Sequence, residues 1–365
     1  MTHTSTQQAA ASAEEAATAR FTVPAKHPMV TVLGSGDALL RVIETSFPGV
    51  DIHVRGNEIR ATGDPGEVAL VQRLFDEMML VLRTGQPMTE DAVERSIAML
   101  RSRGEGSGAS PAEVLTQNIL SNRGRTIRPK TLNQKRYVDA IDKHTVVFGI
   151  GPAGTGKTYL AMAKAVQYLQ SKQVNRIILT RPAVEAGERL GFLPGTLYEK
   201  IDPYLRPLYD ALHDMIDPDS IPRLMAAGTI EVAPLAYMRG RTLNDAFIIL
   251  DEAQNTNPEQ MKMFLTRLGF DSKIVITGDV TQVDLPGGTR SGLRQVQEIL
   301  RDVEDVHFSL LSSSDVVRHK LVGRIVDAYD RYDRSTGTDH GDPHRPAGGH
   351  PADRSRDGGR RRGGE

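Results

Sequence analysis

The second half of the chain alternates short apolar runs with helical stretches. Between Thr145 and about Tyr329 the apolar runs are TVVFGI, RIILT, TIEVA, FIILD, KIVITG and VHFSL. Nearly continuous hydrophobic strands separated by helices are typical of a parallel sheet that is covered on both faces. The sequence therefore predicts an α/β fold for this region.

A different pattern, in residues 25–100, predicts a small α+β domain. MVTVLG, which begins at Met29, reads as a strand, and the residues after it place Leu39 to Phe47 on one helical face. GVDIHVRGNEIRATG alternates apolar and polar positions on both sides of a turn, as a two-stranded hairpin does. Two helices follow, PGEVALVQRLFDEMMLVLR and a segment from Thr89 to Leu100.

Composition sets the remaining boundaries. Residues 1–20 are rich in Ser, Thr and Ala and are predicted to form a disordered tail, and residues 331–365 a second one, rich in Arg, Gly and His. Residues 101–121 begin with a Gly/Ser-rich run and are interpreted as a linker. The α/β domain is therefore assigned to residues 122–330.

The charge and the residue types exclude several classes of function. A formal net charge of -1 gives no overall attraction to nucleic acid or membrane, so any such surface must be local. The absence of cysteine excludes disulfides, thiolate catalysis and Cys-ligated zinc. No signal peptide is recognisable, and no apolar run approaches the ~20 residues that span a bilayer. We expect a soluble, cytoplasmic protein without a membrane partner.

One glycine-rich segment carries the strongest chemical signal. GPAGTGKT lies directly between the strand TVVFGI and an amphipathic helix, which is the context in which G-x-x-x-x-G-K-T binds phosphate. Glycines let backbone N–H groups wrap a phosphate, and the positive end of the next helix points at it. Lys157 is expected to contact the β- and γ-phosphates, and Thr158 to bind Mg²⁺. The candidate nucleotide-binding residues are Gly151, Pro152, Ala153, Gly154, Thr155, Gly156, Lys157 and Thr158.

Two acids end the strand in AFIILDEAQ, which we expect to neighbour the strand of the phosphate loop. Asp251 is placed to hold Mg²⁺, directly or through water, and Glu252 to orient or deprotonate the attacking water. The alternative is a strand that ends in two acids without a role. Since a kinase for small molecules would not need a water activator, Glu252 favours hydrolysis.

Three further side chains are candidates for contact with the nucleotide. Gln282 follows the strand KIVITG and could report whether the γ-phosphate is present, although such an acidic turn can also cap a helix. Gln134 could read the adenine edge with its amide. Arg318 could stabilise γ-phosphate charge from this subunit or a neighbouring one. For Gln134 and Arg318 the alternative is a solvated side chain.

Two segments are candidates for contact with a polymer. Residues 122–137, NRGRTIRPKTLNQKRY, are rich in Lys and Arg, although a solvated run of charge would look the same. The segment ILTRPAVEAGERLGFLPG contains Arg181, Glu185, Glu188 and Arg189 and emerges at the same sheet edge as the phosphate loop. Because aromatic residues make up 5% of the chain and Trp is absent, we expect contacts mainly to phosphates.

Together these motifs resemble the PhoH-like family of ATPases. The runs that carry the resemblance are GPAGTGKTYLA, LTRPAVEAGERLGFLPGTLYEKIDPYLRPLYDAL, PLAYMRGRTLNDAFIILDEAQNT, MKMFLTRLGF, TGDVTQVDLP and DVVRHKLV, over roughly residues 125–330. The resemblance implies a RecA-like core, close to superfamily-1 helicases but with one core per chain, that uses ATP and Mg²⁺. It also implies a role in RNA metabolism or ribosome maturation, with single-stranded RNA, a YbeY-type endoribonuclease or ribosome-associated proteins as partners.

The same resemblance extends to the amino-terminal module and to the assembly. The module is similar to a KH-type fold, but its loop GSGD, Gly34 to Asp37, places an acid in the GXXG pattern that clamps RNA. With one core per chain, a cleft around ATP would form between subunits, so we expect a homo-oligomer such as a hexameric ring. The arginines that could reach a neighbouring phosphate loop are Arg239, Arg241, Arg290 and Arg318.

Two other classes of function remain open at this point. The first is an ATP-dependent adaptor whose nucleotide state recruits a ribonuclease or another protein without remodelling a strand. The second is a small-molecule kinase, which Glu252 and Gln282 disfavour.

Overall fold

The computed structural model describes residues 16–102, 109–182, 197–286 and 289–317, and in residues 197–204 only the backbone is described. The chain divides into two compact units, Met1–Val317 and Arg318–Glu365. In the second unit the described residues are all helical: Leu321, Val322, Ile325, Ala328 and Arg331. The predicted tails therefore lie largely outside the described residues. Within the described parts, no helix has the combination of length and apolarity needed to cross a membrane.

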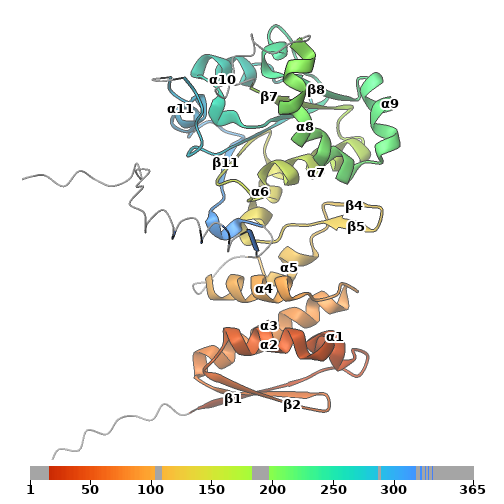
Figure 1. Ribbon diagram of the computed structural model, residues 1–365, viewed down its shortest axis with the longest axis vertical. Helices are drawn as coiled ribbons and strands as arrows, with labels where there is room; N and C mark the ends of the chain where they lie inside the picture. Colours follow the sequence, from red (N-terminus) through yellow and green to blue (C-terminus); the bar gives the residue numbers. More distant parts are fainter. Residues whose placement is uncertain are drawn as a thin grey trace, which may run out of the picture. The chain divides into compact units, whose positions relative to one another are not determined.

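The amino-terminal module is a three-stranded antiparallel sheet with helices packed on one face (Figure 1). Its strand order is β1-β3-β2. The predicted hairpin and the three helices that were expected after residue 37 are confirmed, while the KH-like assignment stays a prediction. The elements are β1 (Ala17–Thr22), α1 (Met29–Leu33), η1 (Ser35–Asp37), α2 (Ala38–Ser46), β2 (Val50–Arg55), β3 (Glu58–Gly63), α3 (Pro65–Arg83) and α4 (Glu90–Ser102).

Two expectations for this module were wrong. Residues 17–20 are not tail but part of β1, which pairs with β3 over its whole length because Ala17, Ala19 and Phe21 face the core. The Phe21 ring stacks on Phe75 at 5.7 Å. The segment from Met29 is the short helix α1 rather than a strand, so the GSGD loop joins two helices. A run of five apolar and β-branched residues does not by itself distinguish these states.

The predicted linker also contains regular structure. Its described part holds α5 (Pro111–Thr116), which begins with a capping box between Ser110 and Glu113. The hairpin of β4 (Leu120–Asn122) and β5 (Arg125–Ile127) follows, so the α/β domain begins slightly before residue 122. The Gly/Ser-rich run at 103–108 lies outside the described residues.

The α/β domain is built on a six-stranded sheet in which every named pair is parallel. The strand order is β11-β6-β10-β9-β7-β8, and all six predicted strands are present. Its strands are β6 (Val146–Ile150), β7 (Arg176–Arg181), β8 (Ile230–Pro234), β9 (Ala246–Leu250), β10 (Lys273–Gly278) and β11 (Val306–Leu310). Its helices are α6 (Leu132–Lys143), α7 (Lys157–Gln170), α8 (Leu197–Met215), α9 (Ile221–Ala226), α10 (Pro258–Leu265) and α11 (Gly292–Ile299), with the short turns η3 (Pro218–Ser220), η4 (Leu235–Met238), η5 (Ala253–Asn255) and η6 (Ser313–Asp315).

Both faces of this sheet are covered, as predicted. Val147 and Ile249 belong to one apolar cluster, which also contains residues of α6, α7, α8 and α9. Their chain neighbours Phe148 and Ile248 belong to a second cluster with residues of α10 and α11. Successive residues of a strand point to opposite faces, so the two clusters are the two outer layers around the sheet (Figure 1).

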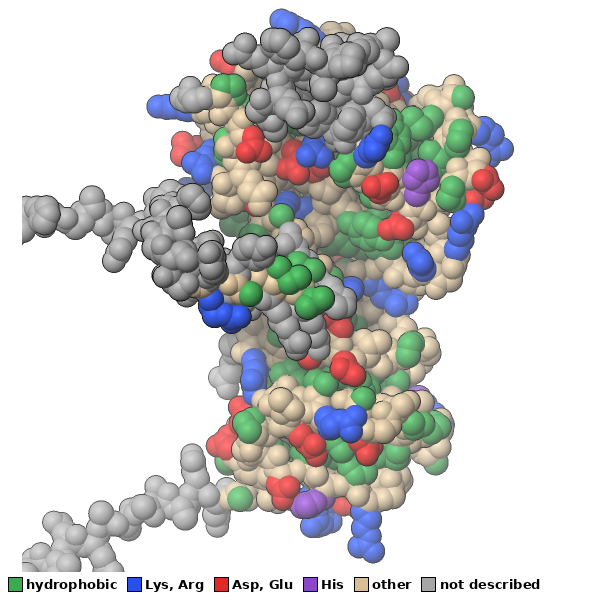
Figure 2. Space-filling view, viewed as in Figure 1, with side chains coloured by type: hydrophobic (Ala, Val, Ile, Leu, Met, Phe, Trp, Pro, Cys, Tyr) green, Lys and Arg blue, Asp and Glu red, His purple; other side chains and the backbone are tan. Residues whose placement is uncertain are grey.

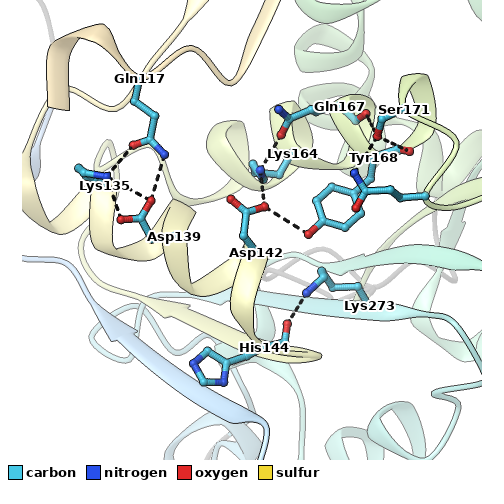
Figure 3. A network of polar contacts seen from close by, with 11 residues as sticks. Gln117, Lys135, Asp139, Asp142, His144, Lys164, Gln167, Tyr168, Ser171 and Lys273 are labelled. Carbon is cyan, nitrogen blue, oxygen red and sulfur yellow. Dashed lines mark hydrogen bonds and ion pairs between the residues drawn. The ribbon is translucent and has the colours of Figure 1, made fainter. Parts of the chain in front are cut away.

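A polar network joins α6, α7 and the start of β10 on one side of the sheet (Figure 3). The Asp142 carboxylate accepts hydrogen bonds from Lys164 Nζ at 2.5 Å and from the Tyr168 hydroxyl at 3.2 Å. Lys164 is 4% exposed, so Asp142 supplies most of the compensation for a buried ammonium. Lys273 donates to the backbone carbonyl of His144 at the end of α6.

The substitution Asp142→Ala tests this pair. It leaves the Lys164 ammonium with only the Gln167 side chain as a polar partner. We expect the free energy of unfolding to fall by about 2 kcal/mol in a urea titration, below the cost for a fully buried pair because Asp142 is partly exposed. Asp139→Ala on the same helix breaks the pair with Lys135, whose side chain is more exposed than that of Lys164, and should cost less than about 1 kcal/mol. Equal losses in the two variants would contradict the role given to burial.

Candidate functional site

The phosphate loop connects β6 to α7 and depends on glycine at three points. Gly154 and Gly156 have φ values of 83° and 79°, which other residues rarely adopt. At Gly151 a Cβ atom would lie 2.4 Å from the Leu311 carbonyl oxygen, so only glycine fits there. The Gly151 N–H donates to the Gly278 carbonyl at 3.1 Å, which ties the loop to the end of β10.

A buried tyrosine supports the first turn of α7. The Tyr137 hydroxyl donates to the Lys157 backbone carbonyl at 3.2 Å, and its side chain is fully buried. A Cβ at Gly149, inside β6, would lie 2.8 Å from the Tyr137 ring. Glycine in this strand therefore allows α6 to bring the ring against the nucleotide loop.

The Lys157 side chain lies inside the loop. Its Nζ donates to the carbonyls of Gly151 and Pro152 at 2.7 and 2.8 Å. Burial lowers the pKa of Lys157, and the charges of Asp279, Glu252 and Asp251 act in the opposite direction. The ammonium is thus held where the loop can receive an anion, and a phosphate oxygen could replace the two carbonyls as its partner.

Two hydroxyl groups converge on one carboxylate oxygen beside the loop. Asp251 Oδ1 accepts from the Thr158 hydroxyl at 2.7 Å and from the Thr277 hydroxyl at 2.7 Å. Hydroxyl and carboxylate oxygens are the ligand types that Mg²⁺ prefers, so Thr158 and Asp251 fit the predicted metal. Among the described residues there is no group of three or more His, Cys, Asp or Glu that could hold a metal ion.

The strand order corrects one expectation about this cluster. The strand that carries Asp251, β9, does not neighbour β6, because β10 lies between them. The intervening strand contributes Thr277, which belongs to the polar end of KIVITGD and for which the sequence predicted no role of its own. A hydroxyl residue at the end of a buried strand was the available signal, but the strand order that places it beside Asp251 could not be read from the sequence.

Glu252 points away from the metal candidates. Its backbone is left-handed, with φ 52°, which is uncommon for a residue with a Cβ. One carboxylate oxygen accepts from Gln254 Nε2 at 2.5 Å, and the other lies 3.5 Å from Arg181 Nη2. The two carboxylates therefore face different groups: Asp251 faces the loop threonine, and Glu252 faces Gln254 and Arg181. Their separate roles stay predictions.

At the end of β10, Asp279 is more closely engaged with the site than Gln282. Asp279 Oδ1 accepts from the Thr281 N–H and hydroxyl at 2.9 and 2.6 Å, while Oδ2 is buried without a hydrogen-bond partner. Gln282 is exposed, and its backbone N–H closes a turn on the Asp279 carbonyl. The role of Gln282 as a reporter of the γ-phosphate stays a prediction.

Gln134 binds the protein itself. Its Nε2 donates to the Thr155 carbonyl at 3.0 Å, and its Oε1 accepts from the Lys130 N–H at 2.7 Å. Gln134 is 3% exposed and stabilises the phosphate loop through Thr155. To hydrogen-bond adenine, as predicted, it would have to exchange these partners. Arg318 lies outside the described residues, as do Glu185, Glu188 and Arg189.

One of the candidate arginines for a neighbouring subunit is already paired. Arg241 makes two hydrogen bonds to Glu231, at 2.6 and 2.8 Å, so it would have to leave this partner to serve a neighbouring subunit. This contact raises the pKa of Arg241 and lowers the pKa of Glu231. Arg239 and Arg290 are exposed.

The basic stretch 122–137 is partly neutralised in the same way. Arg123 pairs with Asp217, Arg125 lies 3.9 Å from Asp214, and Lys135 bonds Asp139. The interpretation of this stretch as a surface for phosphates is weakened, because its hairpin uses its arginines to contact nearby acids.

Comparisons with known proteins identify the family of the chain. The family model for PhoH-like proteins matches residues 126–330. A PhoH-like protein of Mycobacterium tuberculosis (strain ATCC 25618 / H37Rv) is 68% identical over 305 residues, which cover 84% of this chain and 86% of that protein. A PhoH-like protein of Bacillus subtilis (strain 168) is 50% identical over 303 residues, which cover 83% and 94%. The solved Pif1 helicase from Candida albicans aligns with 55% of this chain and 43% of its own at 12% identity and a TM-score of 0.30, too low to carry an argument.

Lys157→Ala tests the phosphate loop. Removing the buried ammonium should weaken ATP binding by about 100-fold or more, because a charge-assisted contact of about 3 kcal/mol is lost. Titration calorimetry with ATP and Mg²⁺ measures this. Lys172→Ala, at an exposed position after the same helix, should bind as the unaltered protein does. Unchanged affinity in Lys157→Ala would contradict the assignment of the loop.

Proposed function

Because the chain belongs to the PhoH-like protein family, we propose that it is a Mg²⁺-dependent ATPase that acts on RNA. The observation that carries the ATPase part is the convergence of Thr158 and Thr277 on Asp251, directly beside a glycine loop that encloses Lys157. This combination supplies what phosphoryl transfer to water requires: a grip on the phosphates, a place for the metal and a separate acid for the water.

Each part of the site has a distinct task in this proposal. The loop N–H groups and the start of α7 bind the phosphates, and Lys157 balances charge on the β- and γ-phosphates. Thr158 and Asp251 would hold Mg²⁺, which would supply charge neutralisation at the phosphates. Glu252, which is held away from Asp251, accepts a proton from the attacking water or orients it.

The RNA part rests on the family resemblance and on one basic surface. On the solvent face of the amino-terminal sheet, the register places Arg20 opposite Arg60 and Arg60 opposite His53. All three are exposed, and Figure 2 shows Lys, Arg and His side chains that project from the end of the module carrying β1 and β2.

The charge of the two arginines in this row is only partly compensated within the module. Glu58 lies 3.9 Å from Arg20, and Asp51 lies 3.0 Å from His53. Like charges placed directly opposite across strands repel, and a phosphate backbone lying across the strands would relieve this repulsion. We call this row, Arg20, Arg60 and His53, the basic sheet face.

Glu252→Gln tests hydrolysis separately from binding. The amide cannot accept the proton of the attacking water, so kcat should fall by about 10²- to 10⁴-fold while ATP affinity stays within about twofold. Glu259→Gln, at an exposed position on α10, should turn over ATP as the unaltered protein does. Turnover that survives Glu252→Gln would show that another group activates the water.

The RNA proposal predicts that single-stranded RNA stimulates ATP turnover and that the stimulation fades as salt rises. Arg60→Glu should raise the RNA concentration for half-maximal stimulation by about tenfold, because it reverses charge at the centre of the basic sheet face. Arg73→Glu, at an exposed position on α3, is the matched control and should leave that concentration unchanged. Hydrolysis without any response to RNA would overturn the RNA proposal and favour the ATP-dependent adaptor.

A further inference from the structure

One peptide unit at the end of β10 connects the phosphate loop to the candidate catalytic glutamate. The carbonyl of this peptide, from Gly278, accepts from the Gly151 N–H at 3.1 Å. Its N–H, from Asp279, donates to Gln254 Oε1 at 3.0 Å. Because a peptide unit is planar, a rotation that changes one of these hydrogen bonds changes the other.

Gln254 continues this connection to Glu252. Its Nε2 donates to Glu252 Oε2 at 2.5 Å, so its two amide atoms link Asp279 to Glu252. Gln254 belongs to the turn η5 and is 1% exposed. A buried amide cannot exchange these partners for water without cost, so its orientation is fixed by the two groups that it bonds.

The end of β10 is shaped to accept this amide. A Cβ at Gly278 would lie 2.9 Å from Gln254 Oε1 and 2.5 Å from the Leu293 side chain. Glycine at this position therefore allows the amide to approach the strand end closely. The backbone carbonyl of Gln254 is held separately, by the Ser291 hydroxyl at 2.8 Å.

A second observation indicates that this strand end is completed by a ligand. Asp279 Oδ2 is buried without a hydrogen-bond partner, on a residue that is 4% exposed. A buried carboxylate oxygen without a partner is costly, and such atoms concentrate where a ligand or an ordered water binds. Asp279 thus has an unsatisfied side chain on the nucleotide edge and a backbone N–H committed to Gln254.

We infer that Gln254 is a positioning residue that sets the orientation of Glu252 according to the state of the phosphate loop, through the Gly278–Asp279 peptide. The inference rests on the proposed ATP hydrolysis and deepens it. Nucleotide bound at Gly151 to Thr158 acts on the Gly278 carbonyl through Gly151, and the amide of Gln254 passes the resulting rotation to the Glu252 carboxylate. Water activation is thereby tied to occupation of the loop.

Gln254→Met is the first test, since methionine has a similar length and shape but none of the amide hydrogen bonds. We expect kcat to fall about tenfold or more while ATP affinity stays within about twofold, because Gln254 touches neither the phosphates nor the metal candidates. Ser291→Ala is the matched control. It removes the hydrogen bond to the Gln254 backbone but leaves the amide link intact, so it should lower the melting temperature without lowering kcat.

A double-mutant cycle distinguishes positioning from a general loss of structure. If Gln254 acts through Glu252, adding Gln254→Met to Glu252→Gln should reduce kcat by less than twofold further. A purely structural effect would multiply the two losses. Hydrogen exchange gives a second readout: the Asp279 amide should exchange faster in Gln254→Met and should change its protection on nucleotide binding only when Gln254 is present.

The outcomes separate this inference from the proposed function. An unaltered protein that binds ATP but does not hydrolyse it would overturn the proposed ATPase, and this coupling with it. Normal turnover in the unaltered protein together with unchanged kcat in Gln254→Met, or with multiplied losses in the double variant, would overturn the coupling alone.

Discussion

The hydrogen bonds that Thr158 and Thr277 donate to one oxygen of Asp251 depend on the register of the parallel sheet. Thr158 lies in the helix that follows β6, Thr277 lies near the end of β10, and Asp251 follows β9. They meet because parallel strands end at the same edge. Side chains alternate between faces along a strand, so a slip of one residue in β9 would bring its neighbour toward the loop in place of Asp251. The chemistry of the edge is therefore a consequence of strand pairing within the hydrophobic core.

The carboxyl edge of the sheet also holds several buried charges, and burial of a charge is unfavourable. Lys157, Asp251 and Asp279 are each exposed by less than a tenth, and Glu252 lies beside them. Three carboxylates thus face two cations, the Lys157 ammonium and the Arg181 guanidinium that pairs with Glu252. A divalent cation that arrives with the nucleotide opposes this excess of negative charge, which gives a physical reason for a metal requirement. The left-handed backbone of Glu252 and the buried charges are features that cluster at ligand-binding sites.

The sequence predicted best what local pattern controls. All six strands of the α/β domain follow from apolar runs, and the position of the glycine loop between β6 and α7 follows from its motif. The prediction from sequence failed where tertiary packing determines the secondary structure. Most of β1 was predicted to be a polar tail, whereas its Phe21 stacks on Phe75, and α1 was predicted to be a strand. Thr277, Asp279 and Gln254 gain their importance from strand order, and no spacing along the chain reveals that β10 lies between β6 and β9.

The packing of Tyr137 against Gly149 has a spectroscopic consequence. The chain has nine tyrosines and no tryptophan, so its ultraviolet emission comes from tyrosine alone. One of these phenols is fully enclosed and bonded to the carbonyl of Lys157, at the point where α7 meets the phosphates. The protein therefore carries an intrinsic fluorophore in contact with the first residue of α7. A Tyr137→Phe variant identifies the contribution of this residue to the tyrosine emission without any added dye.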